Sequence, residues 1–364
     1  MKVSVPEFIL SIKPYVPGKP IEELEREYGI SDSIKLASNE NPLGPSPKAV
    51  QAIAEAVGKL HRYPDGSAHG LVRKIAEKFG LSPENVVPGN GSDEIIGLLS
   101  RVLLKHGDEA VLPYPSFLVY EIAVRSVGGR PVQIPLRSMK MDLQRMLDSM
   151  TDRTRMVFIC NPNNPTGTVI SEGEFEWFMS RIPPDVWVVI DEAYIEFVRN
   201  PDCLQGVGWV DNERPVAVLR TFSKVYGLAG LRIGYGLMPS ALTRLIHRIR
   251  APFNAGSLAQ AGAIAALDDD SFLKKTLDQI HSGLAYLYDA LDRRGIEYHS
   301  TEANFFLIRV QDAEAVFHAL LREGVIVRSM RSYGYSDCIR VNVGLDEENR
   351  RFIDALDRVL GKRE

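Results

Sequence analysis

The sequence predicts an α/β fold, with a mostly parallel sheet between helices and a smaller α+β domain after it. Between about residue 85 and about residue 240, short apolar runs alternate with helical stretches, which is typical of a parallel sheet covered on both faces. After about residue 250, long helices precede short strands, which indicates a second domain. We therefore expect an arm and part of the small domain at 1–40, a large domain at 41–255 and a small domain at 256–364.

Composition narrows the class of protein. The 364 residues can bury a large core, and 43 basic against 47 acidic residues give a net charge of −4. No basic stripe is visible, so we expect neither nucleic acid nor an anionic membrane as the main partner. The three cysteines are widely separated and show no metal-ligand spacing, so no disulfide framework or metal site is indicated. With no signal-peptide core and no membrane-length apolar run, we expect a cytoplasmic protein.

The first 80 residues predict an arm and two helices. Prolines and a short acidic helix at 21–29 are typical of an arm, and the LASNENPLGPSP segment that follows has the composition of a loop. Apolar positions at 49–60 follow helical spacing. The stretch 70–80 then predicts a short amphipathic helix that Gly80 ends.

Each short strand predicted in the middle of the chain ends in a polar cluster. These strands are 86–87, 110–112, 156–160, 186–190 and 216–219, and they end in PGNGSD, PYPSF, NPNNPTG, DEAY and RTFSK. In sheets of this kind, ligands bind outside the carboxyl ends of the strands. The sequence therefore predicts a binding site at this edge of the sheet.

The last third of the chain predicts the smaller domain. Two helical stretches come first, the second beginning at an Asp270 or Ser271 cap. Strands are then expected at 296–299, 304–310, 325–328 and 338–343, with helices at 312–323 and from Glu347.

Residues 219–235 combine an amine with groups that bind anions. Thr221, Ser223, Lys224 and Arg232 lie within a dozen residues, among small residues that allow close approach of the backbone. Lysine forms Schiff bases with carbonyl compounds when its surroundings make it nucleophilic. Taken alone, the segment favours the simpler interpretation of an exposed loop lysine and a surface arginine, because short motifs recur by chance.

Three further strand ends carry candidate groups. Gly91, Ser92 and Asp93 open a helix, where free N–H groups attract a phosphate, although an ordinary capped helix has the same pattern. Glu94 replaces the third glycine of a dinucleotide fingerprint, and no P-loop occurs. Asp191 directly follows an apolar strand and needs a cationic partner or strong hydrogen-bond donors if buried. The alternatives are a helix cap for Asp191, a turn for Asn164 and core packing for Phe117; these last two also follow strands.

Together these motifs resemble the fold-type-I aminotransferases that depend on pyridoxal 5'-phosphate (PLP). The matching motifs are GSD, PYPSF, NPNNPTG, DEAY, SK and GLAGLRIG, in that order along almost the whole chain. KPYVPGKPIEEL, LASNENPLGP, RYPDG, GVIVRSM and CIRVNVG resemble the histidinol-phosphate aminotransferase family in particular. The resemblance implies a large PLP-binding domain, a homodimer with shared active sites, and transfer of an amino group between L-histidinol phosphate and 2-oxoglutarate in histidine biosynthesis.

The resemblance also implies roles around the cofactor. Lys224 would bind PLP covalently and carry a proton, Asp191 would pair with the ring nitrogen, and Phe117 would stack on the ring. Asn164 and Tyr194 would bind the side of the ring that carries the hydroxyl. The cofactor phosphate would be held by the residues Gly91, Ser92, Thr221, Ser223 and Arg232, and by Tyr63 of the neighbouring subunit, while Asp93 is expected to contact the cofactor as well.

Substrate recognition would depend on the small domain and the arm. An arginine within an apolar strand is costly to bury without an anion, and both Arg328 and Arg340 occupy such strands. The resemblance implies that Arg340 binds the α-carboxylate of glutamate or the substrate phosphate, that Asn164 also contacts the substrate, and that Arg328 and a partner subunit's Tyr15 recognise the substrate phosphate. A structural salt bridge is the alternative for either arginine. An aromatic amino-acid aminotransferase, a threonine-phosphate decarboxylase and a non-catalytic PLP-binding regulator are the alternative functions.

Overall fold

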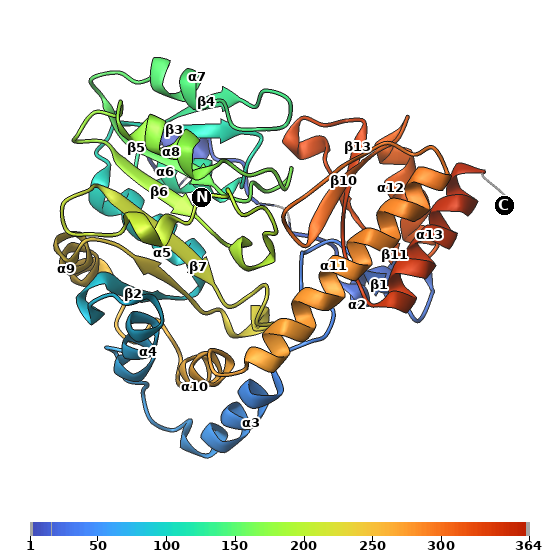
Figure 1. Ribbon diagram of the computed structural model, residues 1–364, viewed down its shortest axis with the longest axis horizontal. Helices are drawn as coiled ribbons and strands as arrows, with labels where there is room; N and C mark the ends of the chain where they lie inside the picture. The colour runs from blue at the N-terminus through green and yellow to red at the C-terminus, as the bar shows by residue number, and fades with distance from the viewer. Residues whose placement is uncertain (1–2, 16, 362–364) are drawn as a thin grey trace.

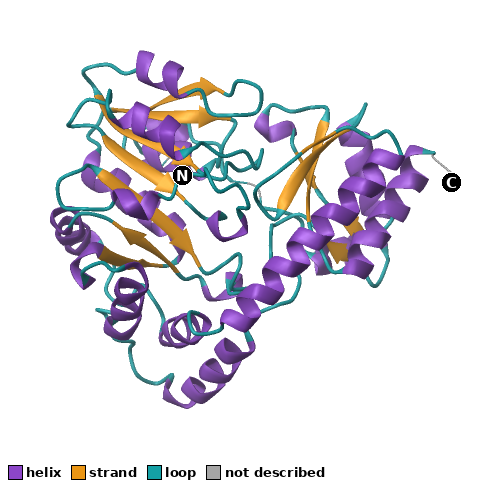
Figure 2. Ribbon diagram, viewed as in Figure 1, coloured by secondary structure: helices purple, strands orange, loops and turns teal. Residues whose placement is uncertain are grey.

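The computed structural model describes residues 3–15 and 17–361, and it divides into a larger and a smaller part (Figure 1). Residues 1, 2 and 16 of the expected arm lie outside this description. The large sheet and its helices form one part, while β10, β13 and the C-terminal helices form the other (Figures 1 and 2). Among the described residues, no helix is both long enough and apolar enough to cross a membrane.

The large part is built on a seven-stranded sheet. Its strands, in spatial order, are β2 (Val86–Gly89), β8 (Gly234–Leu237), β7 (Val216–Thr221), β6 (Trp187–Asp191), β5 (Thr154–Cys160), β3 (Glu109–Tyr114) and β4 (Arg130–Pro135). Strand β8 runs in the opposite direction to the other strands of this sheet, which all share one direction. The expectation of a mostly parallel sheet is therefore confirmed. The sequence reasoning did not identify β4 or β8: β4 is largely exposed, and the glycines of β8 resemble a loop.

Helices cover both faces of this sheet because its strands are apolar on both sides. Along β5, Phe158 packs with α5, α6 and α9, while Ile159 points to the face covered by α4, α7 and α8. The helices of this part are α3 (Pro47–Ala56), α4 (His69–Phe79), α5 (Gly91–Leu103), α6 (Val119–Ser126), α7 (Leu143–Asp148), α8 (Glu172–Met179), α9 (Ser240–Ile249) and α10 (Ser257–Ala266). Gly80 ends α4 in a left-handed conformation, as expected.

The smaller part contains an antiparallel sheet and two long helices. The sheet has the order β12 (Arg328–Ser329), β13 (Cys338–Asn342), β10 (Phe305–Arg309) and β9 (Tyr298–His299). Its helices are α11 (Asp270–Arg293), α12 (Ala313–Arg322) and α13 (Asp346–Leu360). The N-cap of α11 is Asp269, which accepts a hydrogen bond from the Phe272 amide, so the predicted cap at Asp270 or Ser271 is wrong by a residue or two.

The N-terminal arm joins both parts. Helix α1 (Glu7–Leu10) lies against α6, and the Phe8 ring contacts the His106 ring at 5.9 Å. Further on, α2 (Ile21–Tyr28) leads into β1 (Ile34–Lys35), which pairs with β11 (Val325–Ile326) of the smaller part. The proposed domain limits remain a prediction. Because α10 packs on α3 and α4, we propose that the large domain ends after α10 rather than at residue 255.

Candidate active site

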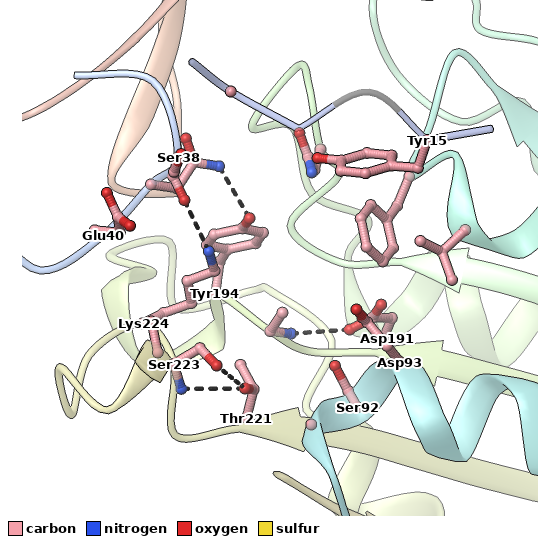
Figure 3. Close-up of a pocket in the computed structure, with 18 of the residues that line it drawn as sticks. Tyr15, Ser38, Glu40, Ser92, Asp93, Asp191, Tyr194, Thr221, Ser223 and Lys224 are labelled. Atoms are coloured by element: carbon pink, nitrogen blue, oxygen red, sulfur yellow. Dashed lines mark hydrogen bonds between the residues drawn. The ribbon is translucent and has the colours of Figure 1, made fainter. Parts of the chain in front are cut away.

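A cavity of about 520 Å³ opens at the carboxyl edge of the large sheet, between the two parts (Figure 3). The arm, the large part and the smaller part all contribute to its wall. Nearly all of the candidate residues line it: Tyr15, Gly91, Ser92, Asp93, Phe117, Asn164, Asp191, Tyr194, Thr221, Ser223, Lys224, Arg232, Arg328 and Arg340. Tyr63 does not line this cavity.

Strand direction explains why these residues meet. The parallel strands β6 and β7 end at Asp191 and Thr221, and Asn164 follows the end of β5. Strand β8 runs the other way, and Gly234 at its start pairs with both Thr221 and Gly89. Arg232, just before β8, is therefore brought to the same edge as the carboxyl ends of the parallel strands.

Lys224 presents its amine to the cavity. Its Nζ donates a hydrogen bond to the Ser38 carbonyl oxygen at 3.0 Å and lies 5.6 Å from the centre of the Tyr194 ring. Burial and the nearby Arg340 charge lower the pKa of this lysine to about 8. About a tenth of the amine is therefore neutral, and able to attack a carbonyl, at pH 7.

Asp191 is a buried carboxylate that lacks a positive partner. It is 3% exposed, and its oxygens accept hydrogen bonds from the Tyr120 hydroxyl at 2.7 Å and the Ala193 amide at 3.2 Å. No salt bridge reaches it from any residue in the described parts of the chain. Burial raises the pKa of this carboxyl to about 6. A cationic nitrogen in the cavity would supply the missing charge.

Hydroxyls, backbone amides and Arg232 gather at one end of the cavity. The Ser223 amide donates to the Thr221 hydroxyl at 3.1 Å, and the two hydroxyls lie 3.0 Å apart. Gly91 has a φ of 77°, and a Cβ there would lie 2.8 Å from a terminal nitrogen of Arg232. A side chain at position 91 would thus collide with the guanidinium. These donors, with the start of α5, suit a phosphate group.

Arg328 and Arg340 face each other across two neighbouring strands. They are directly paired in the β12–β13 register, so both side chains project from the same face of the sheet. Arg340 is 5% exposed and donates to Asn164 Oδ1 at 2.5 Å and the Ala37 carbonyl at 2.8 Å, while its buried Nε has no hydrogen-bond partner among the described residues. Because like charges directly opposite are destabilising, the arrangement favours an anionic ligand.

The arm covers the cavity of its own chain. The guanidinium of Arg328 lies 5.8 Å from the centre of this chain's Tyr15 ring, and Tyr15 lines the cavity with it. Helix α1 is held against α6, so the chain continues over its own sheet edge. The expectation that a partner's arm supplies Tyr15 to the site remains a prediction.

Tyr63 lies away from this cavity. Its side chain is 83% exposed and stacks on Phe253, with ring centres 4.8 Å apart. Phe253 itself has a left-handed backbone with a φ of 59°. This exposed aromatic pair is on the surface, where it is available to another molecule.

Sequence reasoning missed several residues of the site. Tyr120 reaches Asp191 from α6, and Asn39 donates to Tyr194 at 2.9 Å from a segment interpreted only as a loop. Cys160 is 2% exposed but also lines the cavity, and burial raises the pKa of its thiol to about 12. No local signal identifies Tyr120 or Cys160. The polar composition of LASNENP was the available signal for Asn39.

The fold and the site together define a class of enzyme that binds a phosphorylated, aldehyde-bearing ring. Comparison with known proteins agrees. Residues 31–356 match the family model described as aminotransferase class I and II. A protein named histidinol-phosphate aminotransferase from Moorella thermoacetica is 47% identical to this chain, over 97% of this chain and 92% of its own length. A protein named "Histidinol-phosphate aminotransferase 2" from Carboxydothermus hydrogenoformans is 48% identical, over 96% of this chain and 97% of its own length.

A solved structure gives the same result. The histidinol-phosphate aminotransferase of Sinorhizobium meliloti, in complex with pyridoxal-5'-phosphate, superposes with a TM-score of 0.89 at 28% identity, over 97% of this chain and 96% of that one. The chain belongs to the class I and II aminotransferases and, within them, to the histidinol-phosphate aminotransferase family. It is a PLP-dependent transaminase, and the cavity fits this cofactor: an amine for the aldehyde, a carboxylate for the ring nitrogen and a cradle for the phosphate.

Proposed function

We propose that this enzyme transfers an amino group between L-histidinol phosphate and 2-oxoglutarate, giving imidazole-acetol phosphate and glutamate, in histidine biosynthesis. One observation carries the proposal: a single cavity joins Lys224 and Asp191 to two facing arginines, Arg328 and Arg340. A transaminase that alternates between a dicarboxylate and a phosphorylated amine needs anion binding of this kind beside the reacting amine.

The cofactor would be held by groups at opposite ends of the cavity. PLP, when bound, supplies an electron-poor ring that draws electrons from the bond broken in the substrate. Lys224 Nζ would hold it covalently, Asp191 would keep its ring nitrogen protonated, and Phe117 would stack on the ring. Asn164 and Tyr194 would donate hydrogen bonds on the opposite side. Its phosphate would lie among Gly91, Ser92, Thr221, Ser223 and Arg232, and the Asp93 carboxylate lies 3.9 Å from the Arg232 guanidinium.

Lys224 would also move the proton. Its lowered pKa, about 8, makes the neutral amine accessible as a base near neutral pH, which general acid–base catalysis requires. The Ser38 carbonyl holds this amine 3.0 Å away, on the side of the cavity where residues 37–40 pass. The amine therefore has a defined position from which to accept and return a proton.

Substrate binding would use the two arginines differently. Arg340 is buried and fixed by Asn164 and Ala37, so we assign it to the carboxylate of glutamate or, in the other half-reaction, to a substrate anion. Arg328, with Tyr15, would recognise the phosphate of histidinol phosphate at the cavity mouth. An arginine fork binds either anion in bidentate fashion.

We further propose a homodimer that works in the cytoplasm. Tyr63 is 83% exposed in this chain, and a phosphate contact in a partner's cavity would give it a role. Leu60, Val57 and Phe253 are exposed near it and offer apolar surface for the contact. The three free cysteines are all buried, which suits a chain that folds without disulfides in a reducing compartment.

The test is a transamination assay. Purified enzyme loaded with PLP should convert imidazole-acetol phosphate and glutamate to histidinol phosphate and 2-oxoglutarate, and Lys224→Ala should abolish the conversion. Failure of the wild-type enzyme to form either product would refute the substrate assignment. Release of carbon dioxide from threonine phosphate would instead indicate the decarboxylase.

A further inference from the structure

Residues 37–40 pass between the two parts of the molecule and touch the site with three consecutive residues. The Ala37 carbonyl accepts from Arg340 at 2.8 Å, and the Ser38 carbonyl accepts from Lys224 at 3.0 Å. Next, Asn39 Nδ2 donates to the Tyr194 hydroxyl at 2.9 Å, as the dashed line to that hydroxyl marks in Figure 3. This short segment therefore contacts a substrate-binding arginine, the reactive amine and a cofactor-binding tyrosine.

Asn39 is held in an unusual backbone conformation. Its φ is 55°, in the left-handed region that asparagine tolerates better than most residues, and it is 1% exposed. Its backbone amide donates to Asn342 Oδ1 at 3.1 Å, and its carbonyl accepts from Asn304 Nδ2 at 3.2 Å. Both partners belong to the smaller part. A strained residue persists where its surroundings fix it, and such residues concentrate at functional sites.

The contact with Asn39 determines what Tyr194 can do. A tyrosine hydroxyl has one hydrogen to donate. Because the oxygen of Tyr194 already accepts from the Asn39 amide, its hydrogen is left to point elsewhere, and Tyr194 lines the cavity. Burial raises the pKa of Tyr194, so the hydroxyl keeps this hydrogen over the working pH range.

We propose that Asn39 is a positioning residue: its amide orients the Tyr194 hydroxyl as a hydrogen-bond donor to the cofactor ring. Its backbone ties that orientation to the smaller part through Asn304 and Asn342. The inference deepens the proposed function, because it rests on the role given there to Tyr194. It predicts that Asn39 influences the cofactor only through this tyrosine.

A double-mutant cycle tests the proposal in the PLP-loaded enzyme. Asn39→Gly removes the amide but tolerates the left-handed backbone and keeps the bonds to Asn304 and Asn342. The measurement is the pH midpoint of the visible absorption of bound PLP. We expect Asn39→Gly and Tyr194→Phe to move this midpoint in the same direction, by about 0.5 to 1 pH unit for a hydrogen bond of ordinary strength. The double variant should move it no further than Tyr194→Phe.

Two further variants separate positioning from a structural role. Asn304→Ala removes one of the two side-chain bonds to the Asn39 backbone but leaves the Asn342 bond and the Asn39–Tyr194 contact in place, so it should lower the melting temperature without moving the midpoint. Asn39→Ser, whose side chain is too short for the contact, replaces the glycine variant if that one does not fold. Additive shifts in the double variant, an unchanged midpoint in Asn39→Gly, or an equal shift in Asn304→Ala would each overturn the proposal. Absence of PLP absorption in the wild type would instead refute the proposed function.

Discussion

Lys224 and Asp191 share one cavity, and burial shifts their pKa values in opposite directions. The pKa of Lys224 falls to about 8 and that of Asp191 rises to about 6, because burial penalises the charged form of each. The lysine thereby becomes a better nucleophile. The aspartate becomes a group whose charge is costly until a cation accompanies it.

The pKa of Lys224 predicts how capture of the cofactor depends on pH. In cofactor-free enzyme, the rate of covalent PLP binding should rise about tenfold per pH unit below pH 8 and level off above it, since only the neutral amine attacks. Stopped-flow absorbance against pH measures this. An unperturbed lysine would instead give a rate that still rises at pH 10, which would contradict the assigned environment.

The pKa of Asp191 predicts a pH-dependent effect on stability. The folded pKa of about 6 exceeds the unfolded value of 3.8, so the contribution of this carboxyl to stability is complete below pH 3.8 and is lost as the pH rises through 6. Cofactor-free Asp191→Asn should therefore melt about 2–4 °C above wild type at pH 8 but not at pH 4. With PLP bound the order should reverse, because the wild type binds the cofactor more tightly.

A matched control for this prediction is Asp185→Asn. Asp185 forms a surface pair with Arg155 at 3.4 Å, and exposed pairs contribute little. Its melting temperature should follow that of the wild type at both pH values. Equal behaviour of the two variants would contradict the idea that burial of Asp191 is the cause.

At the scale of elements, the β12–β13 pair places two positive charges opposite each other. The register fixes Arg328 against Arg340, so one strand pair presents two anion-binding groups at once. The amino-acid sequence predicts the two strands separately and does not show that they pair with each other. The pairing follows from the hairpin-like return of the chain between residues 329 and 338.

This pairing predicts selective losses. Arg328→Ala should raise KM for histidinol phosphate by about 10- to 100-fold, which corresponds to the free energy of a charge-assisted hydrogen bond. It should leave KM for glutamate nearly unchanged. Arg340→Ala should impair both half-reactions, because Arg340 is assigned to both anions. Steady-state kinetics with each donor measures the split. A uniform loss for Arg328→Ala would favour a structural salt-bridge role.

Strand ends were the most predictable feature of the elements. The apolar runs at 156–160 and 186–190 became β5 and β6, within two residues at each end, and their polar neighbours reached the cavity. Helix caps were less predictable: Asp269, Asp270 and Ser271 are all good capping residues, and only the fold selects Asp269. Strand β8 was not predicted, because its antiparallel pairing depends on partners that lie far away in the sequence.

For the whole molecule, the exposed aromatic pair of Tyr63 and Phe253 predicts a subunit contact. Leu60→Glu, which places a charge on this surface, should convert a dimer into monomers in sedimentation velocity and should weaken PLP binding, since Tyr63 would no longer reach a partner. Tyr286→Glu, on an exposed face of α11, is the control and should remain dimeric. A wild-type monomer with full activity would contradict the shared site.

Most of the site could be predicted because chemistry gathers at one edge of a parallel sheet. Motif order identified Lys224, Asp191 and Arg232, whereas contacts made by the path of the arm could not be predicted. Tyr15 is the example: it lies at the cavity beside Arg328 because α1 packs on α6, and its motif carries no signal for that packing. Asn39 is another, since its partners lie 155 and 303 residues away.

We propose that one cavity binds a phosphorylated amine and glutamate in turn. Titration of PLP-loaded enzyme with L-histidinol phosphate, in the absence of any keto acid, tests it most directly. The visible absorption of the bound cofactor should be lost as the amino group is transferred, and 2-oxoglutarate should restore it. L-histidinol, which lacks the phosphate, should require at least tenfold higher concentration. An absorption that histidinol phosphate leaves unchanged, while phenylalanine or glutamate alters it, would contradict the account.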